Sequence, residues 1–471
     1  MKRPFLGYNK PISSEILYVA KPLIFSNISR VIMGLVDMIM VGRLGTDAIA
    51  AVGFSEAIQW IFIASVGIAT MIASQAIISR RFGQKNYNEC VDALYCGQLI
   101  SFVVAVPIAV FGYIYCREIL NIIVDDPGIL DMSVQYGRII FIGIYFTINS
   151  FIFRAFFTGI QQTKVYFRVI VTSNIINAYL NLGLIFGTEV IIEYCYDNGI
   201  GFISYLWRFY YFSAMGIEGA AIGTVIASGT GMLLYIFYLF DRDVKQNFVY
   251  LPIRLNRKML KRHIELLIPI SITEASHLIG WSFMLKIIGT LGPLSLAAFH
   301  IVNRVNHSVF MPALGIGQAC STLVGYYIGK NKKRTADIIM FQGLRISLMI
   351  MGSIGIIFII FPSYIAALFT NSEEVISTAS PLIQFCGVMA LFESIGMIFF
   401  SVLEGAGDTK FVGFIGFTEM WIIFIPLCYI FVILYDIGIW GVFYAWTIQY
   451  FYVIITSSIR IIQGKWKNIS L

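Results

Sequence analysis

The sequence predicts an all-α integral membrane protein with 12 transmembrane helices, arranged as two pseudo-symmetric six-helix bundles. Three observations lead to this prediction: an apolar composition, apolar runs that recur along the whole chain, and an internal repeat. Of the 471 residues, 58% are hydrophobic and 13% are charged, and the mean hydropathy is +0.81. A soluble chain carries roughly a quarter charged residues, so this chain lacks the polar surface that would keep it in water.

The apolar runs divide into twelve segments, each long enough to cross a bilayer, which takes about 20 residues. Because backbone groups in hydrocarbon must find their partners within the segment, each run is expected to be a helix. The expected spans are 15–42, 47–77, 91–115, 132–159, 165–187, 217–240, 260–290, 294–326, 336–360, 374–403, 412–434 and 440–463. No cleavable signal peptide is expected, since residues 1–14 are basic and polar and no small-residue cleavage site follows them.

The positions of lysine and arginine predict the orientation, because basic residues are enriched on the cytoplasmic side of membrane proteins. Most of them fall in both terminal tails and in the segments 78–92, 154–168, 241–265, 326–338 and 404–410. The loops on the opposite side are acidic instead, with Asp125, Asp126 and Glu189 among them. We therefore expect a multi-pass protein of the plasma (inner) membrane with both termini in the cytoplasm. The net charge of +7 reflects this topology and contact with anionic lipid, not nucleic-acid binding.

The two halves of the chain resemble each other at a nearly constant offset, which indicates an internal repeat. Residues 22–53 and 269–300 are identical at eight of 32 positions when offset by 247 residues. We expect an N-terminal bundle over 1–240, a basic linker over 241–259 and a C-terminal bundle over 260–471. Parallel six-helix repeats are a transporter architecture, although a duplicated channel or membrane enzyme would show the same repeat. The segment 188–215 has no counterpart of similar length in the second half, and its aromatic part is expected to form a short interfacial helix.

Polar residues in the first, fifth and sixth spans suggest a cation site. A charged side chain at mid-bilayer costs roughly 2.5–3.5 kcal/mol on insertion scales, so each one needs a reason. Asp37 in the first span, Asn177 and Asn181 in the fifth and Thr224 in the sixth could together hold a proton or a small hard cation, which takes oxygen ligands. The alternative is structural: Asp37 pairs with Arg30 on the same helix stripe and holds helices together.

A second set of polar residues lies in the seventh and tenth spans. Glu274 and His277 share one helix face in the seventh span, and Glu393 lies well inside the tenth. Both carboxyl groups could face a central cleft as part of a substrate site or a second coupling site. A carboxyl group in low dielectric is suited to exchange a proton for a cationic ligand. The alternative is a pair of hydrogen bonds that pack helices together.

The sequence lacks the motifs of nucleotide-driven and catalytic proteins. No P-loop, G-x-S-x-G elbow, H-E-x-x-H motif or Gly-rich dinucleotide turn is present. The seven scattered cysteines include no C-x-x-C pair, which argues against a disulfide framework and a metal site. We therefore expect no enzyme activity and no cofactor. The energy for transport would come from an ion gradient, worth about 2.3 kcal/mol per charge per 100 mV.

Several segments together resemble the multidrug and toxic compound extrusion (MATE) family along nearly the whole chain. They are GLVDMIMVGRLGTDAIAAVG, NAYLNLGLIFG, GIEGAAIGTVIA, PISITEAS, LGPLSLAAFHIVNRV, PALGIGQACSTLVGYYIGKN and VLEGAGDTK. The resemblance implies two six-helix bundles that face each other across a central cleft and work by alternating access. It also implies export of organic compounds, often cationic and aromatic, in exchange for protons or sodium ions.

The resemblance also implies roles for individual residues. Asp37 matches the family's essential first-span aspartate, Asn177 and Asn181 match the polar pair of the fifth span, and Thr224 matches the sixth-span threonine of the same cation site. Among the remaining candidates, Glu274 matches the seventh-span glutamate of the NorM-like and eukaryotic branches, and Glu393 matches their tenth-span acid. The DinF-like branch usually lacks these two acids, so the chain looks closer to NorM. It departs from NorM-like members at Met389, where an aromatic residue is proposed to help coordinate the cation.

From these observations we expect a monomeric secondary antiporter that exports an organic, cationic and aromatic compound in exchange for H⁺ or Na⁺. Its other partner is the lipid bilayer, and no metal is expected beyond Na⁺ at the cation site. The competing interpretation is a related flippase for lipid-linked saccharides, which would carry a strongly cationic cavity for phosphate groups. A membrane enzyme would need a clustered catalytic set, and the sequence shows none.

Overall fold

The computed structural model describes residues 7–208, 210–250, 255–469 and 471, and within these ranges the chain is helical without any strand. In these described ranges, eleven helices are long and apolar enough to cross a membrane. They are α1 (Lys10–Gly42), α2–η1–α3 (Thr46–Gly83), α4 (Tyr87–Ile114), α6 (Pro127–Gly159), α7 (Thr163–Phe186), α9 (Gly216–Leu239), α12 (Pro293–Gly329), α13 (Lys333–Ile360), α15 (Glu373–Gly405), α16–η3–α17–η4 (Thr409–Leu434) and α18 (Trp440–Gln463).

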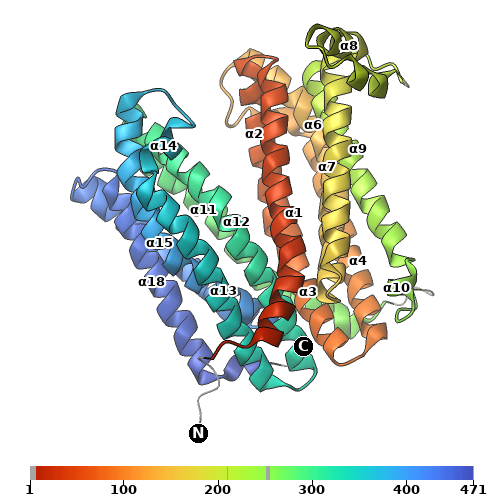
Figure 1. The fold of residues 1–471 in the computed structure, drawn as a ribbon, viewed down its shortest axis with the longest axis vertical. Coiled ribbons are helices and arrows are strands. Elements are labelled where there is room, and N and C mark those ends of the chain that lie inside the picture. The colour runs from red at the N-terminus through yellow and green to blue at the C-terminus, as the bar shows by residue number, and fades with distance from the viewer. Residues whose placement is uncertain (1–6, 209, 251–254, 470) are drawn as a thin grey trace.

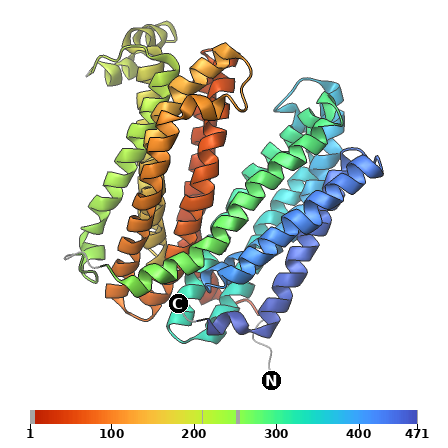
Figure 2. The ribbon, with the colours of Figure 1, turned by 180° about the vertical axis from the view of Figure 1, so that it is seen from behind.

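The twelfth long helix is α11 (Arg257–Gly289), which has 33 residues but falls short of the others in apolar composition. It runs beside α16 within the same group of helices and contacts α3 and α4 of the other group at one end (Figure 2). The described helices therefore confirm the predicted all-α membrane fold. The polar residues that set α11 apart, Glu274 and His277 among them, are the same ones that mark it as a candidate site helix.

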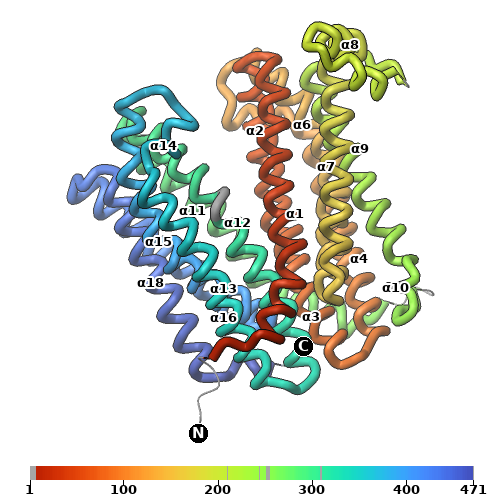
Figure 3. The backbone as a smooth tube through the Cα atoms, viewed as in Figure 1, coloured from red at the N-terminus to blue at the C-terminus, as the bar shows by residue number. Residues whose placement is uncertain are grey.

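The long helices form two groups that lie close together at one end of the molecule and diverge toward the other (Figure 1). The first group runs from α1 to α9 and the second from α11 to α18, as the colour change along the tube also shows (Figure 3). The described chain begins and ends at the end of the molecule where the groups meet, which we call the termini end. The short helix α8 (Thr188–Asp197) lies at the opposite, diverging end.

The segment between the two groups begins with the short helix α10 (Arg242–Lys245), and its residues 251–254 lie outside the described part. α11 starts at Arg257, within the predicted linker of 241–259, because Asn256 caps it. The Asn256 side chain accepts hydrogen bonds from the backbone N–H groups of Lys258 (3.1 Å) and Met259 (3.2 Å). At the diverging end, α8 occupies the first part of the segment 188–215, whereas the aromatic part, which was expected to form the short helix, contains the 3₁₀ turn η2 (Gly201–Trp207).

Glycines allow α3 and α12 to approach closely at the termini end. A Cβ atom on Gly83 of α3 would lie 2.0 Å from the carbonyl oxygen of Tyr326, and one on Gly329 of α12 would lie 2.1 Å from that of Arg80. Only glycine fits at such a backbone contact. A hydrogen bond also joins α3 and α12: the Gln75 side chain donates to Thr322 Oγ1 (3.0 Å). The termini end is therefore closed by direct backbone packing between the two halves.

The segment after α18 folds back across this closed end. Gly464 turns the chain with φ 66°, and Trp466 in the following 3₁₀ turn η5 (Lys465–Asn468) is fully buried. Lys467 forms an ion pair with Asp337 of α13, and Arg80 of α3 donates to the backbone carbonyl of Ile469. The segment thus contacts helices of both groups.

Replacing Trp466 with alanine is expected to destabilise this closed end. Removing a fully buried indole leaves a cavity and costs about 3–5 kcal/mol in folding free energy. The apparent melting temperature of the purified protein in detergent should fall by several degrees. Trp60→Ala is the matched control, because Trp60 is 44% exposed and leaves no closed cavity. Equal melting temperatures for the two variants would contradict the expectation.

Candidate functional site

Asp37 lies at the meeting point of three helices of the first group. It is half-buried on α1, and its Oδ1 atom accepts a hydrogen bond from the buried Asn181 side chain of α7 at 2.8 Å. Thr224 of α9 approaches the same amide pair, since its hydroxyl lies 3.4 Å from Asn177 Nδ2. The structure therefore brings together all four residues of the predicted cation site.

In one of its two orientations, the Asn177 amide forms hydrogen bonds through both its nitrogen and its oxygen. Its nitrogen then donates to Asp37 Oδ1 at 3.2 Å, and its oxygen accepts from the Thr224 backbone N–H at 3.2 Å. Gly223 makes room for the neighbouring amide, because a Cβ atom there would lie 2.0 Å from Asn181 Oδ1. Two amide N–H groups therefore point at one carboxylate. To bind Na⁺, these amides would have to turn and offer their oxygens instead.

The structural alternative for Asp37 is wrong in this structure. Arg30 donates to the Tyr166 hydroxyl and, at 3.4 Å, to Asn27 Oδ1 on its own helix. Among the described residues no ion pair joins Arg30 to Asp37, although both side chains line the same cavity of about 310 Å³. Arg30 and Asp37 are seven residues apart on α1, or about 10 Å. The Asp37 carboxylate contacts the amides of α7 instead.

Asp37 also lines a second cavity, of about 340 Å³, that reaches across to the other group of helices. On the near side, Glu56 of α2 accepts a hydrogen bond from Tyr136 at 3.1 Å. On the far side are Arg304 and His307 of α12. The cation-site candidate is therefore reachable from the space between the two halves, and it has a second carboxylate near it.

Glu274 and His277 of α11 line a third cavity, of about 290 Å³, which also lies between the halves. His277 Nε2 lies 3.0 Å from Oε1 of Glu419, a buried acid of the second group. Trp281 and Trp446 of the same group and Trp60 of α2 supply aromatic walls. An acidic pocket with indole faces is suited to a flat organic cation.

Two π-helical turns border this third cavity, one from each half of the chain. They are η1 (Ile63–Ile68), which interrupts α2 and α3, and η3 (Glu419–Phe424), which follows α16. A π-turn inserts an extra residue in a helix and is frequent at functional sites. Glu419 is the first residue of η3, and its side chain lies opposite His277.

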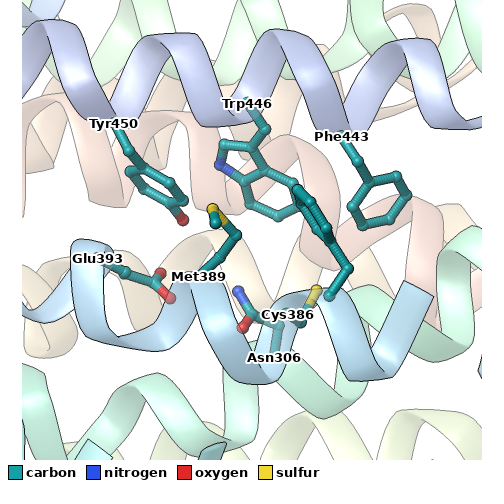
Figure 4. A pocket seen from close by; sticks show the side chains of 8 residues that line it. Asn306, Cys386, Met389, Glu393, Phe443, Trp446 and Tyr450 are labelled. Carbon is teal, nitrogen blue, oxygen red and sulfur yellow. The ribbon is translucent and has the colours of Figure 1, made fainter. Parts of the chain in front are cut away.

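Glu393 lies in a different pocket, which is lined by residues of the second group alone and is only about 10 Å³ in volume (Figure 4). Its carboxyl group interacts with the Tyr450 hydroxyl and the Asn306 amide. Met389, where the sequence departs from NorM-like members, lines the same pocket and accepts a hydrogen bond from Thr447. The structure thus separates Glu393 from Glu274, and only Glu274 lines the cavity between the halves.

Sequence reasoning missed several residues that the structure places at these sites. Glu419 lies in the predicted span 412–434, where an isolated acid in an apolar run could have revealed it. Arg154 was expected in a basic loop, but it is 5% exposed and lines the cavity beside Arg30. The neutral partners Tyr136 and Tyr450 carried no signal, because tyrosines are common throughout this chain.

A model of the MatE family matches this chain twice, over residues 22–182 and 269–430. The chain belongs to the MatE family. The two matched segments start 247 residues apart, which is the offset of the sequence repeat. MATE proteins are multidrug efflux transporters, so the chain is a member of a transporter family.

Curated relatives of this MATE chain carry multidrug resistance names. "Probable multidrug resistance protein NorM" of Thermotoga maritima is 24% identical, with 97% of this chain and 94% of the relative covered. "Probable multidrug resistance protein YoeA" of Bacillus subtilis is 25% identical, with 87% and 84% covered. These names are compatible with the expected NorM-like branch.

Solved structures of MATE transporters share the fold. A MATE transporter in complex with MaD3S superposes with a TM-score of 0.84 at 18% identity, covering 97% of each chain. The eukaryotic MATE transporter AtDTX14 superposes with a TM-score of 0.83 at 16% identity, covering 98% of this chain and 97% of that one. These likenesses support the expected fold of two helical bundles.

Proposed function

We propose that this MATE protein is a secondary antiporter that exports an organic, cationic and aromatic compound in exchange for H⁺ or Na⁺. The observation that carries the proposal is the half-buried Asp37 carboxylate, held by amides of α7 and reached from the space between the halves. The acidic, indole-lined cavity around Glu274 and His277 supports the cationic, aromatic substrate. Each chain contains all of these residues, so a monomer suffices.

The orientation proposed is that of the sequence analysis, with the termini end in the cytoplasm. The diverging end, which carries α8, then faces outward, and the closed termini end blocks access from inside (Figure 1). A cation that enters from outside would bind at Asp37 and weaken substrate binding in the cleft. By the reciprocity of linkage, substrate must weaken cation binding by the same factor.

The proposal is tested by uptake of ethidium, a flat organic cation, into everted membrane vesicles that contain this protein. A proton gradient and a sodium gradient are imposed separately, and vesicles without the protein are the control. Uptake driven by one gradient supports antiport and identifies the coupling ion. If folded protein gives no uptake under either gradient, the proposed function is wrong for this class of substrate.

A second candidate function, a flippase for lipid-linked saccharides, is favoured by one observation. The guanidinium groups of Arg30 and Arg154 line the cavity of the first group, where a phosphate could bind. The acids Asp37, Glu56 and Glu274 line the same cavity or its neighbours, which disfavours a large polyanionic head group. Movement of a fluorescent lipid diphosphate across proteoliposomes would favour the flippase.

Replacing Asn181 with leucine is expected to change the half-saturating concentration of the coupling ion about 10-fold or more, in a direction that identifies the ion. The variant loses a hydrogen bond that stabilises the ion-free carboxylate, and such bonds contribute about 1.5–3 kcal/mol, so protons should bind more tightly. Na⁺ should instead bind more weakly, because it would use the oxygen of the same amide. The measurement is the initial rate of ethidium uptake against ion concentration. Asn174→Ala is the control on the same helix, since Asn174 donates to Ser29 rather than to Asp37. An unchanged half-saturating ion concentration in Asn181→Leu would contradict a role for this amide.

A further inference from the structure

The segment 188–215, which has no counterpart of similar length in the second half, forms one side of a cavity at the diverging end. Its helix α8 and its turn η2 border the cavity together with the last turns of α1 and α7, and the volume is about 390 Å³. This α8 cavity is larger than each of the cavities described above. Neither Asp37 nor Glu274 lines it, so it is separate from the candidate cation and substrate sites.

The side of α8 that borders the cavity is apolar. Val190, Ile191 and Tyr194 of this helix line the cavity, whereas Glu189 and Glu193 on the same helix are exposed and do not line it. A division into an apolar and a charged face is typical of a helix that lies in the membrane interface. The segment therefore presents an apolar surface to the ends of α1 and α7.

The α8 cavity is open to the surroundings of the helices. Among its lining side chains, Ile39 of α1 is 63% exposed, Val190 is 54% exposed and Tyr194 is 50% exposed. Concave apolar surfaces of about 300–1,000 Å³ are typical of ligand sites. Because α1 and α7 both cross the membrane, the molecules beside this opening are lipids. An acyl chain matches both the chemistry of the walls and the location.

One charged side chain borders this apolar cavity. Arg43 directly follows the last residue of α1, is exposed, and has its guanidinium 5.9 Å from the centre of the Tyr194 ring. Among the residues that the structure describes, Arg43 forms no ion pair, although acidic residues are frequent at this end of the molecule. Most basic residues of the chain are at the opposite side of the membrane. Arg43 is therefore a cation that is available to a negative group outside the protein.

We propose that the α8 cavity binds one anionic phospholipid, with an acyl chain between α1, α7 and α8 and the phosphate group at Arg43. A guanidinium donates strong, charge-assisted hydrogen bonds to phosphate oxygens. Arg43 follows the end of α1, which places the head group at the membrane surface, and the apolar walls lie toward the membrane interior from there. None of these residues belongs to the candidate cation or substrate site, so the lipid site does not depend on the proposed antiport.

The test is native mass spectrometry of the purified full-length protein, titrated with phosphatidylglycerol or with phosphatidylcholine. The two lipids carry the same acyl chains, but the first has a negative head group and the second a zwitterionic one. Peak intensities give the dissociation constant of the first lipid bound. We expect phosphatidylglycerol to bind about 5-fold more tightly, which is the effect of one basic residue near an anionic lipid.

The variant Arg43→Gln should remove this preference for the anionic lipid. Arg138→Gln is the matched control and should keep it, because Arg138 is also exposed and also lies 5.9 Å from a tyrosine ring, that of Tyr113, but lines none of the cavities described. Equal affinities of the wild type for the two lipids would overturn the proposal. A preference that survives in Arg43→Gln would overturn it as well.

The variant Val190→Trp tests the acyl-chain site, because the added indole should fill the cavity. Both lipids should then bind about 10-fold more weakly or less tightly still, since excluding two methylene groups from an apolar site already has an effect of this size. Val110→Trp on α4 is the control, because Val110 is similarly exposed (53%) and lines none of the cavities described. An unchanged melting temperature shows that each variant is folded. Undiminished lipid binding by folded Val190→Trp would contradict the site, and a dimer that this variant abolishes would assign the cavity to a second copy of the chain instead.

Discussion

Ethidium uptake driven by an ion gradient is expected to fall about 100-fold when Asp37 is replaced by asparagine, near the upper range of measured coupling energies. The variant keeps the size and the hydrogen-bonding capacity of the side chain but loses the charge that a cation would neutralise. Asn181 and Asn177 can still contact the new amide, so the helices should pack as before. The loss would therefore be one of coupling rather than of folding.

The measurement compares initial rates in everted vesicles at matched protein levels. The control variant is Asp47→Asn, because Asp47 is exposed in the first turn of α2 and lines none of the cavities described. It should transport like the wild type. Normal gradient-driven uptake by Asp37→Asn would remove Asp37 from the coupling mechanism and leave Glu56 or the second-group acids to supply it.

Gly83→Ala is expected to open the termini end and to reduce transport about 10-fold or more. The added Cβ atom would lie 2.0 Å from the Tyr326 carbonyl oxygen, and backbone cannot move aside as a side chain can. Overpacking of this kind costs about 1–3 kcal/mol, a factor of about 5–150 in the balance between the closed and open arrangements. An antiporter that cannot close this end cannot complete its cycle.

The opening can be measured as a distance between spin labels on Gln84→Cys and Lys332→Cys, both exposed positions at the termini end. The seven native cysteines are buried, so the labels should attach to the introduced ones. The label distance should lengthen in Gly83→Ala and stay unchanged in the control Gly289→Ala, where a Cβ atom meets no neighbour within 4 Å. Equal distances in both variants would show that the closed end accommodates the added methyl group without opening, which would contradict the prediction.

Much of the fold could be read from composition and from spacing. Because every apolar run must satisfy its own backbone in lipid, the long helices and their order follow from the runs themselves. Helix ends were less predictable, since they depend on single capping residues such as Asn256, which starts α11 inside the predicted linker. A short helix was expected in the aromatic part of 188–215, but the helix α8 lies at 188–197, and its place at the diverging end needed the tertiary structure.

The candidate site divides in a similar way between sequence and structure. A charge inside an apolar run is costly wherever it lies, so Asp37, Glu274 and Glu393 could be singled out from sequence alone. Which neutral groups surround each charge depends on how the helices pack, and sequence spacing carries no information about neighbours from other helices. Glu393 thus proved to lie in a small pocket within the second group, whereas Glu274 lines the cavity between the halves.

The sequence by itself determined that this is a helical membrane protein with a repeated half, and it located the acids that a transporter would use. Only the tertiary structure decided that Asp37 is held by the α7 amides rather than by Arg30, that His277 meets Glu419, and that Arg154 turns inward beside Arg30. The physical reason is that hydropathy is a property of single segments. Pairing of charges and hydrogen bonds is instead a property of helices that come together from distant parts of the chain.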